Sequence, residues 1–179
     1  MSVYRDGAHG LVRAMTVEAN QLAAYAAWQQ QIESGYPETP LDNPCPLGRF
    51  DRLTQDCMAR RRLHEELAPL DWAVLCARYS LNYAEVDAGI RHLIPRVKSP
   101  AHLLFVTKAV FAWAVPKERR RVKPAFYEIS SWDNDGTPDK TLYRWRAVVY
   151  RSLNEMLSTA HRNGEAVLEA AGLIARSAA

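Results

Sequence analysis

The chain has 179 residues, of which 48% are hydrophobic and 24% are charged, as in an ordinary globular domain that can bury a substantial core. The formal net charge of +3 is unevenly distributed, because residues 91–151 carry 13 Lys and Arg against 5 Asp and Glu and the remainder carries 10 against 15. This asymmetry suggests one surface for an anionic polymer and another for a different partner, and no apolar run reaches the ~18 residues of a membrane span.

The N-terminal third is predicted to be an extension of the main domain. Nothing at the N-terminus resembles a signal peptide, and the three cysteines Cys45, Cys57 and Cys76 cannot all pair within the chain, so we expect reduced thiols and a cytoplasmic protein. Alanine-rich residues 16–34 predict a helix, and the proline-rich residues 36–48 predict an extended connector. The sequence therefore predicts a helical extension over residues 1–48 and a domain over residues 49–176.

The next three helices follow from hydrophobic spacing. Residues 49–67 form the first, with Phe50, Leu53, Cys57, His64 and Leu67 expected near one side, and we interpret His64 as a partly buried structural histidine. Helices over residues 69–79 and 83–93 are separated by the break at 80–82, which makes a first helix-turn-helix candidate. The second helix of this pair carries Glu85 and Asp87, so we interpret it as scaffold or as a surface for a protein.

A mostly apolar helix, capped by Ser99 and opened by Pro100, is predicted to form the centre of the core and to end at Val115 and Pro116. The loop that follows, residues 117–123, carries five positive charges between two prolines, and such a loop suits a phosphate backbone. Solvation alone is the competing interpretation of that loop.

A short helix over residues 125–132 and a turn over 133–136 precede the segment that dominates the prediction. A calcium loop is excluded at this turn, because the position that requires glutamate holds Leu142. The helix expected over residues 137–160, with Thr137 as N-cap, makes this a second and better helix-turn-helix candidate. A break at Asn163 and Gly164 and a short final helix closed by Gly172 complete an all-α fold.

The predicted helix 137–160 has two chemically distinct sides. Seven apolar side chains fall on one face: Leu142, Trp145, Val149, Leu153, Met156, Leu157 and Ala160. Lys140, Arg144 and Arg151 fall on the opposite side. We expect Trp145 to lie in the core and the cations to face outward, although a merely solvated basic surface is the simplest alternative.

Catalytic and metal-binding patterns are absent from the sequence. There is no glycine-rich phosphate loop, no HExxH motif and no paired CxxC motif. Cys45, Cys57, His64 and Cys76 are spaced unlike a zinc knuckle, and Cys57 and His64 on one helix would stand about 10.5 Å apart, too far for a nucleophile–base pair. We therefore expect no enzyme activity, no cofactor and no metal.

The segment CMAR (residues 57–60), the aromatic-rich turn that ends a later helix, and the helix TLYRWR (residues 141–146) together resemble the late-gene antiterminators (Q proteins) of lambda-type phages. The resemblance covers residues 49–174. It implies a helical protein with parts similar to the DNA-binding region 4 of sigma factors, which binds DNA beside a late promoter and loads onto paused RNA polymerase. Some members carry a cysteine-rich zinc motif that this chain lacks.

The sequence thus predicts a sequence-specific, duplex-DNA-binding regulator of transcription, plausibly an antiterminator, with RNA polymerase as partner and its oligomeric state open. Lys140, Thr141, Arg144 and Arg146 are the predicted groove-facing residues, with Tyr143 and Arg151 beside them, and Arg119, Arg120, Arg121 and Lys123 are the predicted phosphate contacts. The alternatives are a helical adaptor or inhibitor of another protein and a small terminase-like DNA-packaging component.

Overall fold

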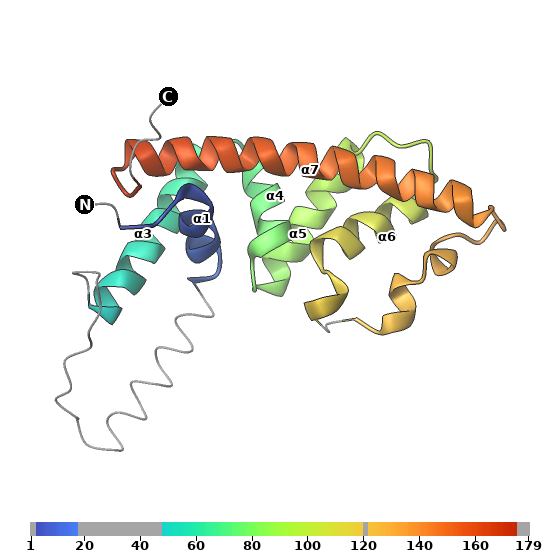
Figure 1. Ribbon diagram of the computed structural model, residues 1–179, viewed down its shortest axis with the longest axis horizontal. Helices are drawn as coiled ribbons and strands as arrows, with labels where there is room; N and C mark the ends of the chain where they lie inside the picture. The colour runs from blue at the N-terminus through green and yellow to red at the C-terminus, as the bar shows by residue number, and fades with distance from the viewer. Residues whose placement is uncertain (1–2, 18–47, 120–121, 175–179) are drawn as a thin grey trace, which may run out of the picture. The chain divides into compact units, whose positions relative to one another are not determined.

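The computed structural model describes residues 3–17, 48–119 and 122–174, and these residues contain helices and no strand. The all-α prediction is therefore confirmed. The described helices are α1 (Gly7–Met15), α3 (Arg49–Glu66), α4 (Pro69–Tyr79), α5 (Tyr83–Leu93), α6 (Leu103–Ala114) and α7 (Asp139–Ala170), as Figure 1 shows. Four short 3-10 helices connect them: η1 (Ile94–Arg96), η2 (Lys117–Arg119), η3 (Pro124–Tyr127) and η4 (Ile129–Trp132).

The described residues divide into two compact units, which differ from the predicted division at residue 48. Unit 1 holds the residues up to Leu67 and those from Gly164 onward, and unit 2 holds residues 68–163. The predicted helix 16–34 and connector 36–48 lie almost wholly outside the described residues. Helix α1, which the sequence did not indicate, is capped by Asp6, whose side chain accepts a hydrogen bond from the backbone N–H of His9.

Unit 1 is organised around a buried carboxylate on α3. Asp56 is 1% exposed and accepts a 2.8 Å hydrogen bond from the Tyr4 hydroxyl. It also pairs with the guanidinium of Arg13 on α1 at 2.6 Å. Burial, with the hydrogen bond to Asp56, raises the pKa of Tyr4, so its hydroxyl stays protonated as the donor. A polar cluster, and not apolar contact alone, holds α1 on α3.

This cluster rotates α3 relative to the prediction. The helix spans almost the predicted range, but its inward row is Asp56, Ala59 and Leu63, whereas Cys57 is half-buried and His64 is exposed. Hydrophobic spacing alone placed His64 on the inner side. It could not show that an aspartate would be buried with partners from α1.

In unit 2, α4 and α5 have the predicted bounds, with the predicted break at residues 80–82 between them. They pack closely because Gly89 has no side chain: a Cβ there would stand 2.6 Å from the carbonyl oxygen of Ala73. Val86 and Ile90 point inward as predicted.

Helix α6 forms the core of unit 2, as predicted, but it begins later than expected. Its buried side chains include Phe105, Val110 and Trp113. The N-cap is His102, whose Nδ1 accepts a hydrogen bond from the Phe105 backbone N–H, so the prediction of a start at Ser99 and Pro100 is wrong. Imidazole is an uncommon cap that helix-start signals do not capture.

The segment before α7 forms two 3-10 turns, η3 and η4, in place of the single short helix predicted over residues 125–132. Tertiary bonds explain the difference. The Tyr127 hydroxyl donates to the carbonyl of Val115, and the indole N–H of Trp132 donates to the carbonyl of Phe126. The first bond ties the segment to the end of α6, and the second folds η4 back onto η3, which a regular helix would not permit.

Helix α7 is longer than predicted, because it runs through Asn163 and Gly164 to Ala170. Gly164 is buried where a Cβ would lie 2.6 Å from the Leu11 side chain, and the Asn163 carboxamide donates to Asp71 at 2.7 Å. The glycine therefore serves close packing, and the predicted break there is wrong. Gly172 ends the helix as predicted, with φ of 70° and a bond from the Leu173 N–H to the Leu168 carbonyl.

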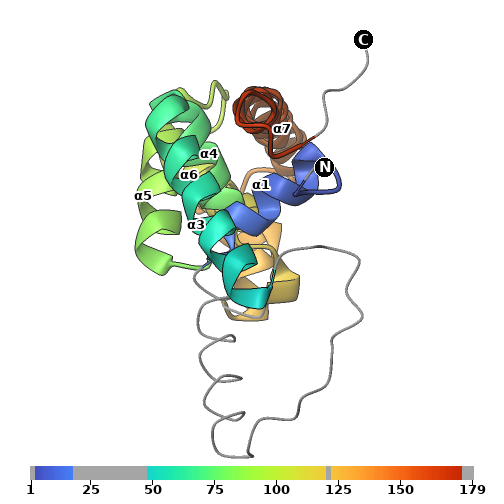
Figure 2. The same cartoon turned by 90° about the vertical axis from the view of Figure 1, so that its left-hand side faces the viewer.

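Within unit 2, α4, α5 and α6 lie on one side of the α7 segment that precedes Gly164. Figures 1 and 2 agree on this arrangement, which leaves the other side of that segment uncovered by these helices.

Candidate nucleic-acid interface

The predicted apolar face of the first half of α7 packs against the other helices of unit 2. Leu142, Val149 and Leu153 are buried. Trp145 is half-buried and makes an edge-to-face contact with Phe105, with ring centroids 5.5 Å apart. The tryptophan thus holds the helix against α6, as expected, although it is less buried than a core residue.

The predicted basic side faces outward. Lys140, Arg144 and Arg151 are all exposed, and none of them forms an ion pair with another residue in the part of the chain that the structure describes. Neither intramolecular pairing nor a covering helix of unit 2 therefore closes this side of α7. Long cationic side chains in this state can donate to phosphate oxygens and to the edges of guanine.

Arg146 occupies a different environment from the other cations. It is half-buried, and its guanidinium lies over the ring of Tyr143 at 4.9 Å and near the ring of Tyr150 at 5.9 Å. This stacking restricts Arg146 to few conformations. Thr141 is half-buried and Tyr143 is half-exposed, so the predicted residues differ in how far they reach solvent.

The second helix-turn-helix candidate does not contain two α-helices. Only the four-residue turn η4 precedes the loop to α7, and the residues before it form the equally short η3. Thr137, the predicted N-cap, instead donates its backbone N–H to Asp133 at 2.8 Å. Helix α7 therefore presents its basic side without the preceding helix of that motif.

Three of the four predicted phosphate contacts have side chains outside the described part of the chain. Lys123 is exposed, whereas Arg120 and Arg121 and the side chain of Arg119 belong to the residues that the structure does not describe.

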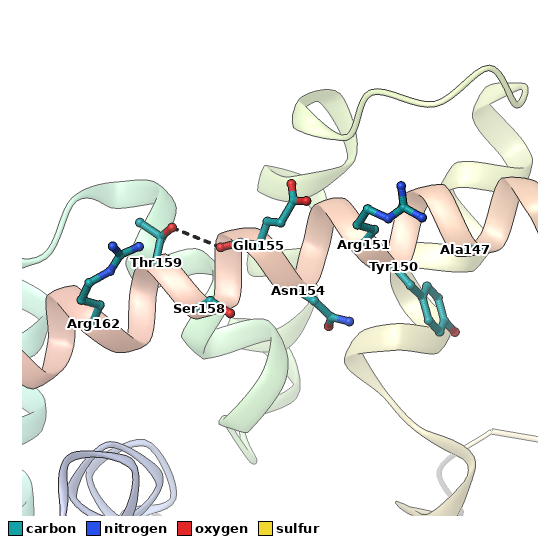
Figure 3. Close-up of a pocket in the computed structure, with 8 residues that line it drawn as sticks. All are labelled: Ala147, Tyr150, Arg151, Asn154, Glu155, Ser158, Thr159 and Arg162. Carbon is teal, nitrogen blue, oxygen red and sulfur yellow. Dashed lines mark hydrogen bonds between the residues drawn. The ribbon is translucent and has the colours of Figure 1, made fainter.

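The middle of α7 carries a shallow groove that the sequence prediction missed. Its lining is Ala147, Tyr150, Arg151, Asn154, Glu155, Ser158, Thr159 and Arg162, shown in Figure 3. Arg162 is exposed, and it forms no ion pair among the described residues. The three-to-four-residue spacing from Lys140 would have revealed this continuation, but the predicted break at Gly164 drew attention to the first half of the helix.

Hydrogen bonds beneath the groove fix the orientation of Asn154. The indole N–H of Trp113 donates to Asn154 Oδ1 at 2.9 Å. Because that indole can only donate, the Asn154 carbonyl must face it, and the amide Nδ2 keeps its hydrogens for another acceptor. Trp113 is itself held by Arg78, which donates to its carbonyl and stacks on its ring.

Tyr150 contributes a neutral hydroxyl to the groove. Burial raises the pKa of this phenol, although Arg146 and Arg78 act in the opposite direction. The groove is therefore rich in hydrogen-bond donors, and Glu155 is its one carboxylate.

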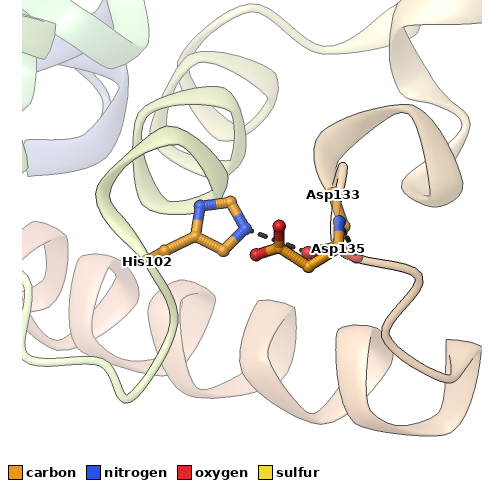
Figure 4. Close-up of side chains that lie close together, drawn as sticks. All are labelled: His102, Asp133 and Asp135. Atoms are coloured by element: carbon orange, nitrogen blue, oxygen red, sulfur yellow. Dashed lines mark hydrogen bonds and ion pairs between the residues drawn. The ribbon is translucent and has the colours of Figure 1, made fainter.

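A cluster of His102, Asp133 and Asp135 is the one group of three ligand-type side chains that lie close together in the described residues (Figure 4). His102 Nδ1 already accepts from Phe105 N–H, so the ring proton belongs on Nε2, which donates to Asp133 at 3.0 Å. The backbone N–H groups of Asp135 and Thr137 bond the other oxygen of Asp133. A metal ion would have to displace these bonds, so we assign the cluster to holding the turn before α7.

The same bonds determine the acidity of Asp133. Hydrogen bonds hold the pKa of Asp133 below its ordinary value of 3.8. The largest cause is the bond from the Thr137 backbone N–H, and the bond from His102 contributes further. The carboxylate stays ionised while it fixes the start of α7.

No helix of the described residues is both long enough and apolar enough to cross a membrane. Comparisons of the chain with protein-family models, with curated proteins and with solved structures find no match.

Proposed function

We propose that this protein binds duplex DNA through the exposed side of α7 and thereby regulates transcription. The observation that carries the proposal is that Lys140, Arg144 and Arg151 line the exposed side of α7, opposite the face that packs against the other helices of unit 2. None of these three cations forms an ion pair with a carboxylate among the described residues. A rigid helix of this kind can enter the major groove, which is about 12 Å wide.

The charges divide between two tasks. Arg144 stands one helical turn from Lys140 and is free to form two hydrogen bonds to a guanine, whereas Lys140 and Arg151 suit phosphates on either side. Arg146, whose guanidinium lies over the Tyr143 ring and near that of Tyr150, serves as a further contact at the edge of the groove.

The role in transcription is supported by the resemblance of residues 57–60 and 141–146 to late-gene antiterminators. In that finer form of the proposal, the protein binds beside a phage promoter and acts on a paused RNA polymerase in the cytoplasm. Polymerase would then contact a surface other than the basic side of α7.

Selection from a pool of random duplexes tests the proposal directly. We expect an enriched sequence motif, and Arg144→Gln should weaken binding to that motif about tenfold or more while changing binding to a scrambled duplex much less, since one bidentate base contact discriminates by about 1–3 kcal/mol. The matched control is Arg91→Gln on α5, where an equally exposed arginine pairs with Asp87. Absence of an enriched motif together with absence of salt-dependent binding would reject DNA recognition.

A protein adaptor is a second candidate because two adjacent leucines at the start of α6 are exposed. Leu103 is 70% and Leu104 is 42% exposed, although both are large apolar side chains. If the adaptor function is correct, Leu103→Ser and Leu104→Ser should abolish capture of a protein partner, and Arg144→Gln should have no effect on it. A ring-shaped assembly, detected by its mass in solution, would instead favour the packaging function.

A further inference from the structure

The groove in the middle of α7 points to a second DNA contact. Among its lining residues, Arg151, Asn154, Ser158 and Arg162 each offer hydrogen-bond donors, and phosphate oxygens only accept. Figure 3 shows Arg151, Glu155 and Arg162 extending from α7. The donor set therefore matches the chemistry of a sugar–phosphate backbone.

The length of the exposed row shows where such a backbone would lie. Lys140 and Arg151 are separated by about 16 Å along the helix axis, and Lys140 and Arg162 by about 33 Å, at 1.5 Å per residue. The first distance already exceeds the width of a major groove, about 12 Å. A straight helix that runs across the groove with Arg144 inside it therefore passes over the flanking strand before it reaches Arg162.

We infer that residues 154–162 of α7 cross the phosphate backbone beside the major groove, with Arg162 on a phosphate and Asn154 Nδ2 and the Ser158 hydroxyl as neutral donors. This inference rests on the proposed function and names the second contact surface of the same helix. The Trp113 indole donates to the Asn154 carbonyl, and this bond leaves the hydrogens of Nδ2 available for a phosphate oxygen.

Glu155 should have the opposite effect on DNA affinity to the arginines beside it. Its carboxylate lines the same groove between Arg151 and Arg162, and no ion pair of Glu155 with either arginine is found within the described residues. On a phosphate backbone this carboxylate repels the ligand. It therefore limits the affinity of the protein for DNA of any sequence.

The test measures binding of the full-length protein to the selected duplex and to a scrambled one over a range of salt concentrations. Arg162→Gln should weaken both complexes by the same factor and reduce the slope of log K against log salt by about 0.9, the value for one phosphate contact. Glu155→Gln should strengthen both complexes severalfold. Arg91→Gln and Asp87→Asn on α5 are matched controls that change charge by the same amount and should change neither slope nor affinity.

Phosphate ethylation interference locates the contact. We expect one sensitive phosphate outside the base pairs at which Arg144→Gln relaxes specificity, and this sensitivity should disappear in Arg162→Gln. If Arg144→Gln lowers specific binding but Arg162→Gln changes neither the salt slope nor the ethylation pattern, residues 154–162 do not contact the phosphate backbone. The proposal that the protein binds DNA would still hold. If the parent protein binds neither duplex, the proposed function is wrong and this inference with it.

Discussion

Arginine has opposite roles in two regions of this protein. In unit 1, Arg13 contacts the buried carboxylate of Asp56 at 2.6 Å, and its side chain is 30% exposed. In unit 2, Arg144 and Arg151 project from α7 without an ion pair among the described residues. The first kind of arginine is required because a buried anion needs a counter-ion, and the second kind leaves its charge available to a ligand.

The comparison shows why arginine content alone does not identify a binding surface. Arg60 donates to the carbonyl of Met15, and Arg78 to that of Trp113, so both serve the fold. What distinguishes Arg144 and Arg151 of α7 is that they face solvent and form no ion pair within the described residues.

Arg13→Met should have the largest effect on stability. The substitution leaves Asp56 buried with its hydrogen bond from the Tyr4 hydroxyl but without its counter-ion, and breaking such a pair costs about 3 kcal/mol of the free energy of unfolding. Urea denaturation at pH 7 measures the loss.

Arg61→Met is the control for that change, since Arg61 forms an exposed pair with Glu65 on the same helix, α3. Its urea midpoint should match that of the parent. Equal losses in the two variants would show that burial of Asp56 does not distinguish the two pairs.

Tyr4→Phe should have an intermediate effect. The change removes one hydrogen bond to an ionised, buried carboxylate but leaves the ion pair with Arg13, so we expect a loss of about 2 kcal/mol. Tyr143→Phe on the exposed side of α7 is the matched substitution and should leave the unfolding curve unchanged. A loss in the second variant as large as in the first would contradict the contrast between the regions.

Asp133→Asn should have a smaller effect that depends on pH. The lowered pKa of Asp133 means that the folded state binds fewer protons than the unfolded state near pH 4, so its stabilising contribution is present above the ordinary pKa of 3.8 and disappears as pH falls through the folded value. The thermal midpoints of the parent and of Asp133→Asn should differ at pH 6 and approach each other as the pH falls below 3.8. A difference that stays constant over this range would exclude the charge of Asp133 as its source.

Arg144→Gln and Arg151→Gln should have the smallest effect on stability, because neither guanidinium has an ion-pair partner in the described part of the chain. Thermal melts should superimpose on that of the parent, although DNA binding changes. A clear drop in the melting temperature of either variant would indicate that these arginines support the fold, and would remove the basis of the proposed interface.

The amino-acid sequence by itself determined most of the helices of unit 2. Pro69 and the residues 80–82 defined α4 and the start of α5, and hydrophobic spacing placed Leu142, Val149 and Leu153 on the buried side of α7 and Arg144 on the exposed side. These features depend on local propensity and on helical periodicity, which are properties of a short stretch of chain.

The tertiary structure alone decided the features that depend on distant partners. Gly164 ends a helix in isolation, but here it is the position where Leu11 packs against α7, so the helix continues and extends the exposed row to Arg162. Asp56 faces inward because Tyr4 and Arg13 satisfy it. A glycine or an aspartate carries the same local preference in either setting, and only the neighbour brought to it by folding determines whether the helix breaks or packs.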